Sequence, residues 1–289
     1  GRAGAPAASA DDPDGPPDPV RLVIATAGLT WEDIDPATTP HLQCLADRSG
    51  AGAMNTTSTS VVSTKRQGLE TLHSGYRGLA EEAPRTSGIP TPATDQWEQL
   101  EVPASTVELG GPDSASGAAD VAAALEDAGI VEVIAPSVSR GDDPARSQQL
   151  ASLDAAVGAV LDELGGCEAA DLPRTLLVSV AATDPEHPEA VEQPGAVASR
   201  TAGLQVALDT AFPDQALTSG ATKQTGVVVL TDVLPTILDS HDARADGLIP
   251  GQPFRGTDHG DPQQLALDRS QAAAQVDAAT VPALGSWFV

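Results

Sequence analysis

Short apolar runs alternate with longer stretches of helical periodicity, and this alternation limits the fold more than any other feature of the chain. Apolar runs of about six residues occur at positions 20–25, 130–135 and 175–180. Between the last two, leucines and valines of residues 144–164 recur at helical spacing and mark one apolar face of a helix. Strands that are apolar on both faces need helices on both sides, so the pattern predicts a three-layer α/β/α fold with a mostly parallel sheet.

Weaker signals extend this alternation along the rest of the chain. They predict helices at residues 36–48, 68–74, 118–128, 232–238 and 262–281, and strands at 105–109, 204–209 and 227–230. The strand at 204–209 alternates apolar and polar residues, which is typical of a half-buried strand. We therefore predict a flexible Pro/Gly/Ala/Asp-rich linker over residues 1–19, one α/β domain over 20–261 and a C-terminal helical segment over 262–289.

Charge and cysteine content exclude some classes of function. A net charge of −26 argues against binding nucleic acid or an anionic membrane surface, because both require basic surface. The two cysteines, Cys44 and Cys167, are too few for a tetrahedral zinc site. They fit either a disulfide in an exported protein or two buried thiols.

Three stretches together resemble the alkaline phosphatase superfamily. The opening strand with Gly28-Leu29 and "TPHLQCLADRSGAGA" (39–53) is similar to the first strand and helix of that superfamily. "STKRQGLETLHSGYRG" (63–78) is similar to its nucleophile turn, and "TGVVVLTDVLPTILD" (225–239) to a late strand and helix. "LTSGATKQTGVVVLTDVLPTIL" and "DGLIPGQPF" resemble more narrowly a group of actinobacterial membrane proteins with an extracytoplasmic domain between membrane segments.

The resemblance implies one or two divalent ions and a Ser or Thr nucleophile, but this chain departs from the pattern at the ligand positions. The first aspartate is replaced by Ala27, and residues 136–143 contain acids but no histidine. Residues 180–183, "VAAT", lack the Asp-His pair, and Asp184 and His187 follow slightly later. Alanine cannot coordinate a metal, so we predict no metal, no cofactor and a vestigial cleft. Its residues would be Ala27, Ser63, Thr64, Lys65, Asp184 and His187.

Two functions remain open. The first is a non-catalytic domain outside the cytoplasm, part of a membrane-anchored cell-envelope protein, that binds or scaffolds an unknown envelope protein or glycan. Membrane contact would come through segments outside this chain, towards which the apolar end at Trp287 and Phe288 would lead. The second is a phosphatase, phosphodiesterase or phosphotransferase that acts on envelope material through Ser63 or Thr64.

Three further sets of residues have both a functional and a structural interpretation. Asp184 and His187 could join His241, Asp242, Asp258 and His259 in a metal cluster, or all could be solvated loop residues. Ser63 or Ser74 with His73 could form a catalytic triad, although no nucleophile elbow supports it. Trp31 and Trp97 are either binding platforms or packing residues.

Overall fold

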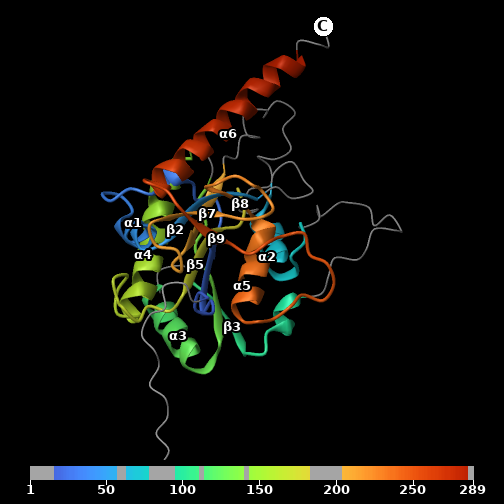
Figure 1. Ribbon diagram of the computed structural model, residues 1–289. Helices are drawn as coiled ribbons and strands as arrows, with labels where there is room; N and C mark the ends of the chain where they lie inside the picture. Colours follow the sequence, from blue (N-terminus) through green and yellow to red (C-terminus); the bar gives the residue numbers. More distant parts are fainter. Residues whose placement is uncertain are drawn as a thin grey trace, which may run out of the picture.

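The computed structural model describes residues 16–56, 63–77, 95–110, 114–139, 143–182 and 204–285. In this part of the chain, nine strands form one mixed sheet with helices on both faces (Figure 1). The prediction of a three-layer α/β/α fold with a mostly parallel sheet is therefore confirmed.

Strands and helices alternate as the sequence predicts up to residue 179, whereas three strands follow one another between residues 205 and 229. The strands are β1 (Leu22–Thr26), β2 (Gly50–Asn55), β3 (Ala104–Glu108), β4 (Ile130–Ile134), β5 (Thr175–Ser179), β6 (Gln205–Asp209), β7 (Gln215–Thr218), β8 (Val227–Val229) and β9 (Arg255–Asp258). The helices are α1 (Pro40–Asp47), α2 (Lys65–Ser74), α3 (Ser114–Asp127), α4 (Arg146–Glu163), α5 (Val233–Ser240) and α6 (Pro262–Gly285).

The sheet has the strand order β3-β4-β1-β5-β6-β2-β7-β9, and β8 also pairs with β2. β3, β4, β1 and β5 are mutually parallel, whereas β6 runs antiparallel to both of its neighbours and β9 runs antiparallel to β7. The central strand β1 therefore ends beside the carboxyl ends of β4 and β5. In open α/β sheets this edge is where ligand sites are built.

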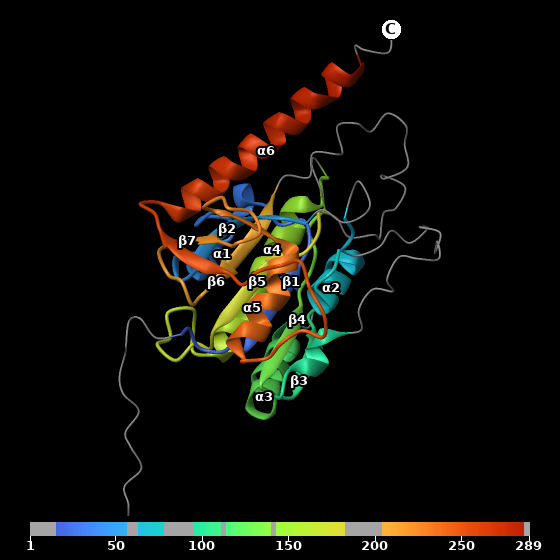
Figure 2. The same cartoon turned by 45° about the vertical axis from the view of Figure 1, so that its right-hand side comes forward.

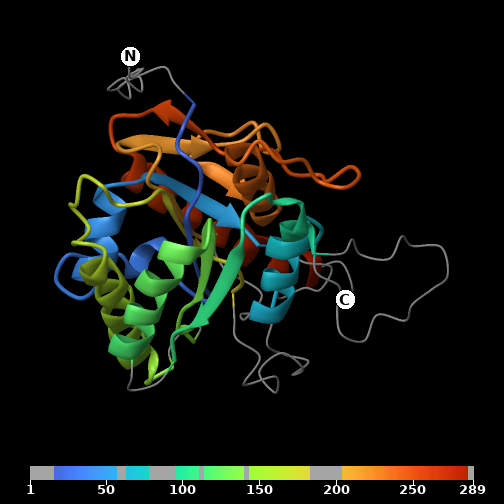
Figure 3. The same ribbon diagram turned by 90° about the horizontal axis from the view of Figure 1, so that it is seen from below.

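Two helical layers enclose the sheet, as Figure 3 shows from below. α1, α3, α4 and the start of α6 cover one face, and α2 and α5 cover the other. Along β1, Leu22 and Ile24 point into the first core cluster, while Val23 and Ala25 point into the second. All four side chains are buried. This explains why these residues of β1 are continuously apolar instead of alternating between apolar and polar.

The prediction of a half-buried strand at residues 204–209 is wrong, because all five residues of β6 are buried. The two polar side chains at its ends have internal partners. Gln205 accepts a hydrogen bond from the Ser179 hydroxyl at 2.8 Å, and Asp209 binds the Arg174 guanidinium at 2.7 and 3.0 Å. β6 lies between two strands under both helical layers, so its polar positions are paired instead of solvated.

The cysteines are joined in a disulfide between Cys44 of α1 and Cys167 in the loop after α4, with their Cα atoms 6.2 Å apart. The structure therefore contains the disulfide, and the alternative of two buried thiols is not observed. α1 is also attached to α4 at its first turn. There the Asp154 carboxylate accepts hydrogen bonds from the backbone N–H groups of His41 and Leu42.

The last helix, α6, leaves the body of the molecule and projects away from it (Figures 1 and 2). Its first turns pack against the sheet, where Ala266 and Ser270 are buried. Among the described residues, no helix combines the length and the apolar character required to cross a bilayer.

Candidate functional site at the carboxyl edge of the sheet

The carboxyl ends of β4, β1 and β5 are joined by a tight backbone network. The Val138 amide donates to the Ala27 carbonyl, and the Gly28 amide donates to the Ala181 carbonyl, both at 2.8 Å. Gly28 has a φ of +80°, and a Cβ atom there would lie 1.8 Å from the Val138 carbonyl oxygen. Only glycine allows the chain to turn so close to the neighbouring loop.

The side chains at this edge carry little chemistry. Ala27, Ala135 and the segment 180–182, Val-Ala-Ala, follow the three strands, and all are buried. The polar side chains that end the strands serve the fold. Thr26 donates to the Pro136 carbonyl at 2.6 Å, and the Ser179 hydroxyl accepts from the Leu29 amide.

The start of α2 brings the hydroxyls of the predicted nucleophile turn to this edge. Ser63 is buried, and its Oγ atom lies 3.1 Å from the Thr56 hydroxyl and accepts a hydrogen bond from the Ala182 amide at 3.3 Å. Thr64 is the N-cap of α2, and it forms reciprocal hydrogen bonds with Gln67 in a capping box. These contacts give Thr64 a clear structural role.

Lys65 and Gly68 fix α2 against the strand ends. The Lys65 ammonium donates to the Ala135 carbonyl at 2.8 Å. A Cβ atom on Gly68 would lie 2.2 Å from the Val180 carbonyl oxygen, so the helix backbone lies directly on the end of β5. The structure thus brings together Ala27, Ser63, Thr64 and Lys65 from the predicted vestigial cleft, whereas Asp184 and His187 lie outside the described residues.

The proposed catalytic triad does not form around His73. Its Nε2 atom lies 3.0 Å from both carboxylate oxygens of Glu132, and its Nδ1 atom lies 3.0 Å from Asp95. The ring also stacks on Trp97 at a centroid distance of 4.8 Å. Ser74 instead forms local hydrogen bonds with the backbone of Tyr76. His73 therefore belongs to an ion-pair cluster between α2 and β4.

Burial of the His73 ring by itself lowers its pKa. The hydrogen bonds and negative charges of Glu132 and Asp95 outweigh burial and raise the pKa to about 9. Sequence reasoning missed this cluster. A usable signal was present, because Glu132 is a lone acid within an apolar run and a buried carboxylate needs a partner.

Two tryptophans and two histidines among the remaining candidates occupy structural positions. Trp31 and Trp97 are buried, and their indole N–H groups donate to the carbonyls of Gly52 and Leu72, so both are packing residues. His241 hydrogen-bonds the Val20 carbonyl, and His259 accepts from the Asp261 amide. Within the described ranges, no three side chains of His, Cys, Asp or Glu are grouped as a metal ion would require.

Comparisons with known proteins show similarity at the level of structure. No family model matches the chain, and no curated protein matches its sequence. Among solved structures, the chain is similar to murine ectonucleotide pyrophosphatase/phosphodiesterase 5, solved as an inactive variant in complex with AMP. The TM-score is 0.46 at 10% identity, and the match covers 83% of this chain and 98% of that chain.

Proposed function

We propose that this chain is a non-catalytic member of the alkaline phosphatase superfamily that serves as a binding or scaffolding domain. The observation that carries the proposal is the chemistry at the carboxyl ends of β4, β1 and β5. Ala135, Ala27 and the Val-Ala-Ala segment at 180–182 stand where an enzyme of this type needs carboxylates and imidazoles. A divalent ion requires oxygen or nitrogen ligands, which these side chains do not offer.

In the contacts that the structure describes, the hydroxyls near this edge lie beside backbone groups and uncharged polar side chains. A serine or threonine attacks efficiently only when a base or a metal ion removes its proton. Ser63 lies beside a hydroxyl and a backbone amide, and Thr64 caps a helix. Lys65 donates to a backbone carbonyl. These contacts support a role in holding α2 on the sheet.

The proposal places the domain outside the cytoplasm, in a membrane-anchored protein of the cell envelope. The Cys44–Cys167 bridge supports this location, because disulfides persist in oxidising compartments. The resemblance to actinobacterial membrane proteins supports anchoring through segments outside this chain. The partner would be an envelope protein or glycan. The net charge of −26 makes nucleic acid a poor candidate, because both would be strongly negative.

Hydrolysis assays test the absence of catalysis. The purified chain is incubated with Zn²⁺, Mn²⁺ or Mg²⁺ and assayed with p-nitrophenyl phosphate and bis(p-nitrophenyl) phosphate. The expected rates equal those of buffer with metal. The variants Ser63→Ala and Thr64→Asn remove each hydroxyl, and asparagine retains the capping function. Ser152→Ala, on the exposed face of α4, is the control. If the chain hydrolyses either substrate, and if Ser63→Ala or Thr64→Asn abolishes this turnover while Ser152→Ala preserves it, the phosphatase, phosphodiesterase or phosphotransferase alternative is established.

Protease treatment of intact cells tests the location. Cells that express the full-length gene are fractionated, and the domain is detected before and after treatment. We expect it in the membrane fraction and open to protease from outside. A product found wholly in the cytosol and protected from protease would contradict the proposal, and a product in the medium would indicate a secreted protein.

A further inference from the structure

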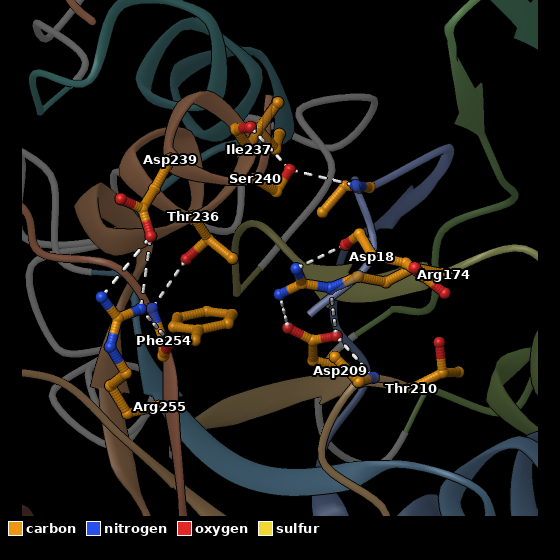
Figure 4. A network of polar contacts seen from close by, with 12 residues as sticks. Asp18, Arg174, Asp209, Thr210, Thr236, Ile237, Asp239, Ser240, Phe254 and Arg255 are labelled. Carbon is orange, nitrogen blue, oxygen red and sulfur yellow. Dashed lines mark hydrogen bonds and ion pairs between the residues drawn. The ribbon is translucent and has the colours of Figure 1, made fainter. Parts of the chain in front are cut away.

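A cavity of about 320 Å³ lies at the end of the sheet opposite to the candidate site, near the amino ends of β1 and β5. Figure 4 shows many of the residues around it. Its wall contains the prolines of the segment 16–19, Phe212 and Phe254, together with charged residues from four segments of the chain. Small-molecule sites usually have volumes of about 300–1,000 Å³, so the cavity is large enough for a small ligand or one long side chain.

One charged pair in the wall is fixed and neutral. Arg174 donates from two nitrogens to the two carboxylate oxygens of Asp209, and both side chains are almost fully buried. A third nitrogen of Arg174 donates to the Asp18 carbonyl at 2.9 Å, and the guanidinium lies 5.7 Å from the Phe212 ring. Breaking such a buried bidentate pair costs several kcal/mol of free energy. Arg174 therefore stays paired with Asp209 and lines the cavity without binding a ligand.

A second pair is looser and also cancels its own charge. Arg255 contacts Asp239 at 3.5 Å, and the two side chains are 59% and 56% exposed. The Nη1 atom of Arg255, which is one of the two nitrogens near Asp239, also donates to the Phe254 carbonyl at 3.0 Å. In the view of Figure 4, the Phe254 ring lies between this pair and the Arg174–Asp209 pair.

The charges that remain in the lining are both negative. Asp18 and Asp242 are exposed, and neither carboxylate has a side-chain partner among the residues that the structure describes. The rest of the lining is mixed, with apolar groups from the proline rings and the Phe212 ring beside the polar side chains of Thr236 and Ser240. The cavity therefore combines apolar patches with an uncompensated negative rim.

We propose that this cavity binds a primary ammonium group carried on an aliphatic stem. The ammonium would donate to the carboxylates of Asp18 and Asp242, and the stem would pack against the proline rings and Phe212. The net charge of −26 assists, because it raises the local concentration of cations around the molecule. Two sources share this chemistry, a free diamine and the lysine side chain of a protein. The proposal is independent of the function suggested for the sheet edge.

Calorimetric titration of the purified chain tests the proposal. The ligands are 1,5-diaminopentane, the capped tripeptide acetyl-Gly-Lys-Gly-amide and glutarate, a dianion of similar length. The variant Asp18→Asn/Asp242→Asn removes both rim charges and should weaken amine binding by about tenfold, since each exposed charge contributes modestly. Asparagine also suits the φ of +53° at Asp242. The control Asp120→Asn/Asp127→Asn makes the same charge change on α3, which covers the other face of the sheet.

Each outcome decides the proposal. Binding of the diamine alone supports a free amine as the natural ligand, and equal binding of the tripeptide supports a lysine side chain. Three results would overturn the proposal. Neither amine binds, or the rim variant loses no more amine affinity than the control variant, or glutarate binds as tightly as the diamine. Thermal unfolding of each variant shows that the compared proteins are folded.

Discussion

At the residue scale, a buried carboxylate explains the surroundings of His73. Glu132 lies in the middle of β4 and is only 2% exposed. An uncompensated charge at such a position costs several kcal/mol. His73 offsets this cost by contacting both carboxylate oxygens, and Thr106 donates to one of them at 3.3 Å. The cluster therefore links α2 to the sheet by charge as well as by packing.

The raised pKa of His73 predicts a pH-dependent contribution to stability. The folded-state pKa is about 9, above the ordinary value of 6.5, so the protonated ring stabilises the fold fully below pH 6.5. This contribution is lost as the pH rises through 9. The His73→Gln substitution should therefore lower the free energy of unfolding by at most about 3 kcal/mol near pH 6 and by much less near pH 10. Urea unfolding across this range measures the difference.

His259→Gln, in an exposed loop, is the control for loss of a histidine. A deficit in His73→Gln that stays constant from pH 6 to pH 10 would contradict a protonated, paired ring.

The residues of the sheet edge were predictable from the order of strands, because Ala27 and Ser63 follow or precede recognisable elements. Glu132 signals that a buried carboxylate needs a partner, but the sequence does not identify His73 as that partner. The members of the cluster are 22 and 59 positions apart and meet only after the sheet has formed.

At the element scale, the strands with the clearest sequence signal are β1, β4 and β5, which are mostly apolar and buried on both faces. β2, β7 and β9 were missed. β2 is buried but consists mainly of glycine and alanine, β7 and β9 have four residues each, and β9 is mostly exposed and polar. The direction of β6 was also unpredictable, because side-chain alternation is the same in parallel and antiparallel strands.

The close contact between α2 and β5 predicts an unusual effect of alanine at Gly68. Alanine in a helix normally stabilises by up to about 1 kcal/mol relative to glycine. At Gly68 the new methyl group would meet the Val180 carbonyl, which is backbone and cannot move aside, so we expect a net loss of about 2 kcal/mol. Gly117→Ala in α3 is the matched control, because the close contact of its methyl group would be with the end of the Leu109 side chain, which can move aside.

Chemical unfolding of both variants measures the two effects. A Gly68→Ala protein that is as stable as Gly117→Ala would show that α2 is free to move away from the strand end. It would also weaken the assignment of Lys65 and Gly68 as residues that hold the helix at the edge.

The disulfide predicts a large loss of stability on reduction. The bridge closes a loop with a sequence separation of 123 residues, and its loss should cost about 4 kcal/mol through the entropy of the unfolded chain. Thermal unfolding with and without dithiothreitol measures this loss. The Cys44→Ala/Cys167→Ala variant should unfold at the temperature of the reduced protein and should not respond to the reductant. Two reactive thiols in the denatured, unreduced chain would contradict the bridge.

At the scale of the whole molecule, α6 divides into a part that belongs to the core and a part that does not. A chain that ends at residue 275 keeps Ala266, Ser270 and their contacts, so its melting temperature should stay within about 2 °C of the parent. A chain that ends at residue 261 loses these contacts and those of Leu265 and Leu267. It should melt about 5–10 °C lower, because about 2–3 kcal/mol of apolar burial is lost. Calorimetry compares the three chains, and equal melting of both truncations would contradict this division.

The position of β1 also governs when the molecule can form during synthesis. β1 is made first, yet its two neighbours in the sheet are β4 and β5, so its partners emerge from the ribosome about 110 to 150 residues later. At about 5–20 residues per second, the strand waits roughly 8–30 s for the second partner. During this interval a short apolar segment with unpaired edges is exposed to other chains. The central strand is thus made first but completed only when β5 arrives, and the nascent protein depends on the cell to shield it until then.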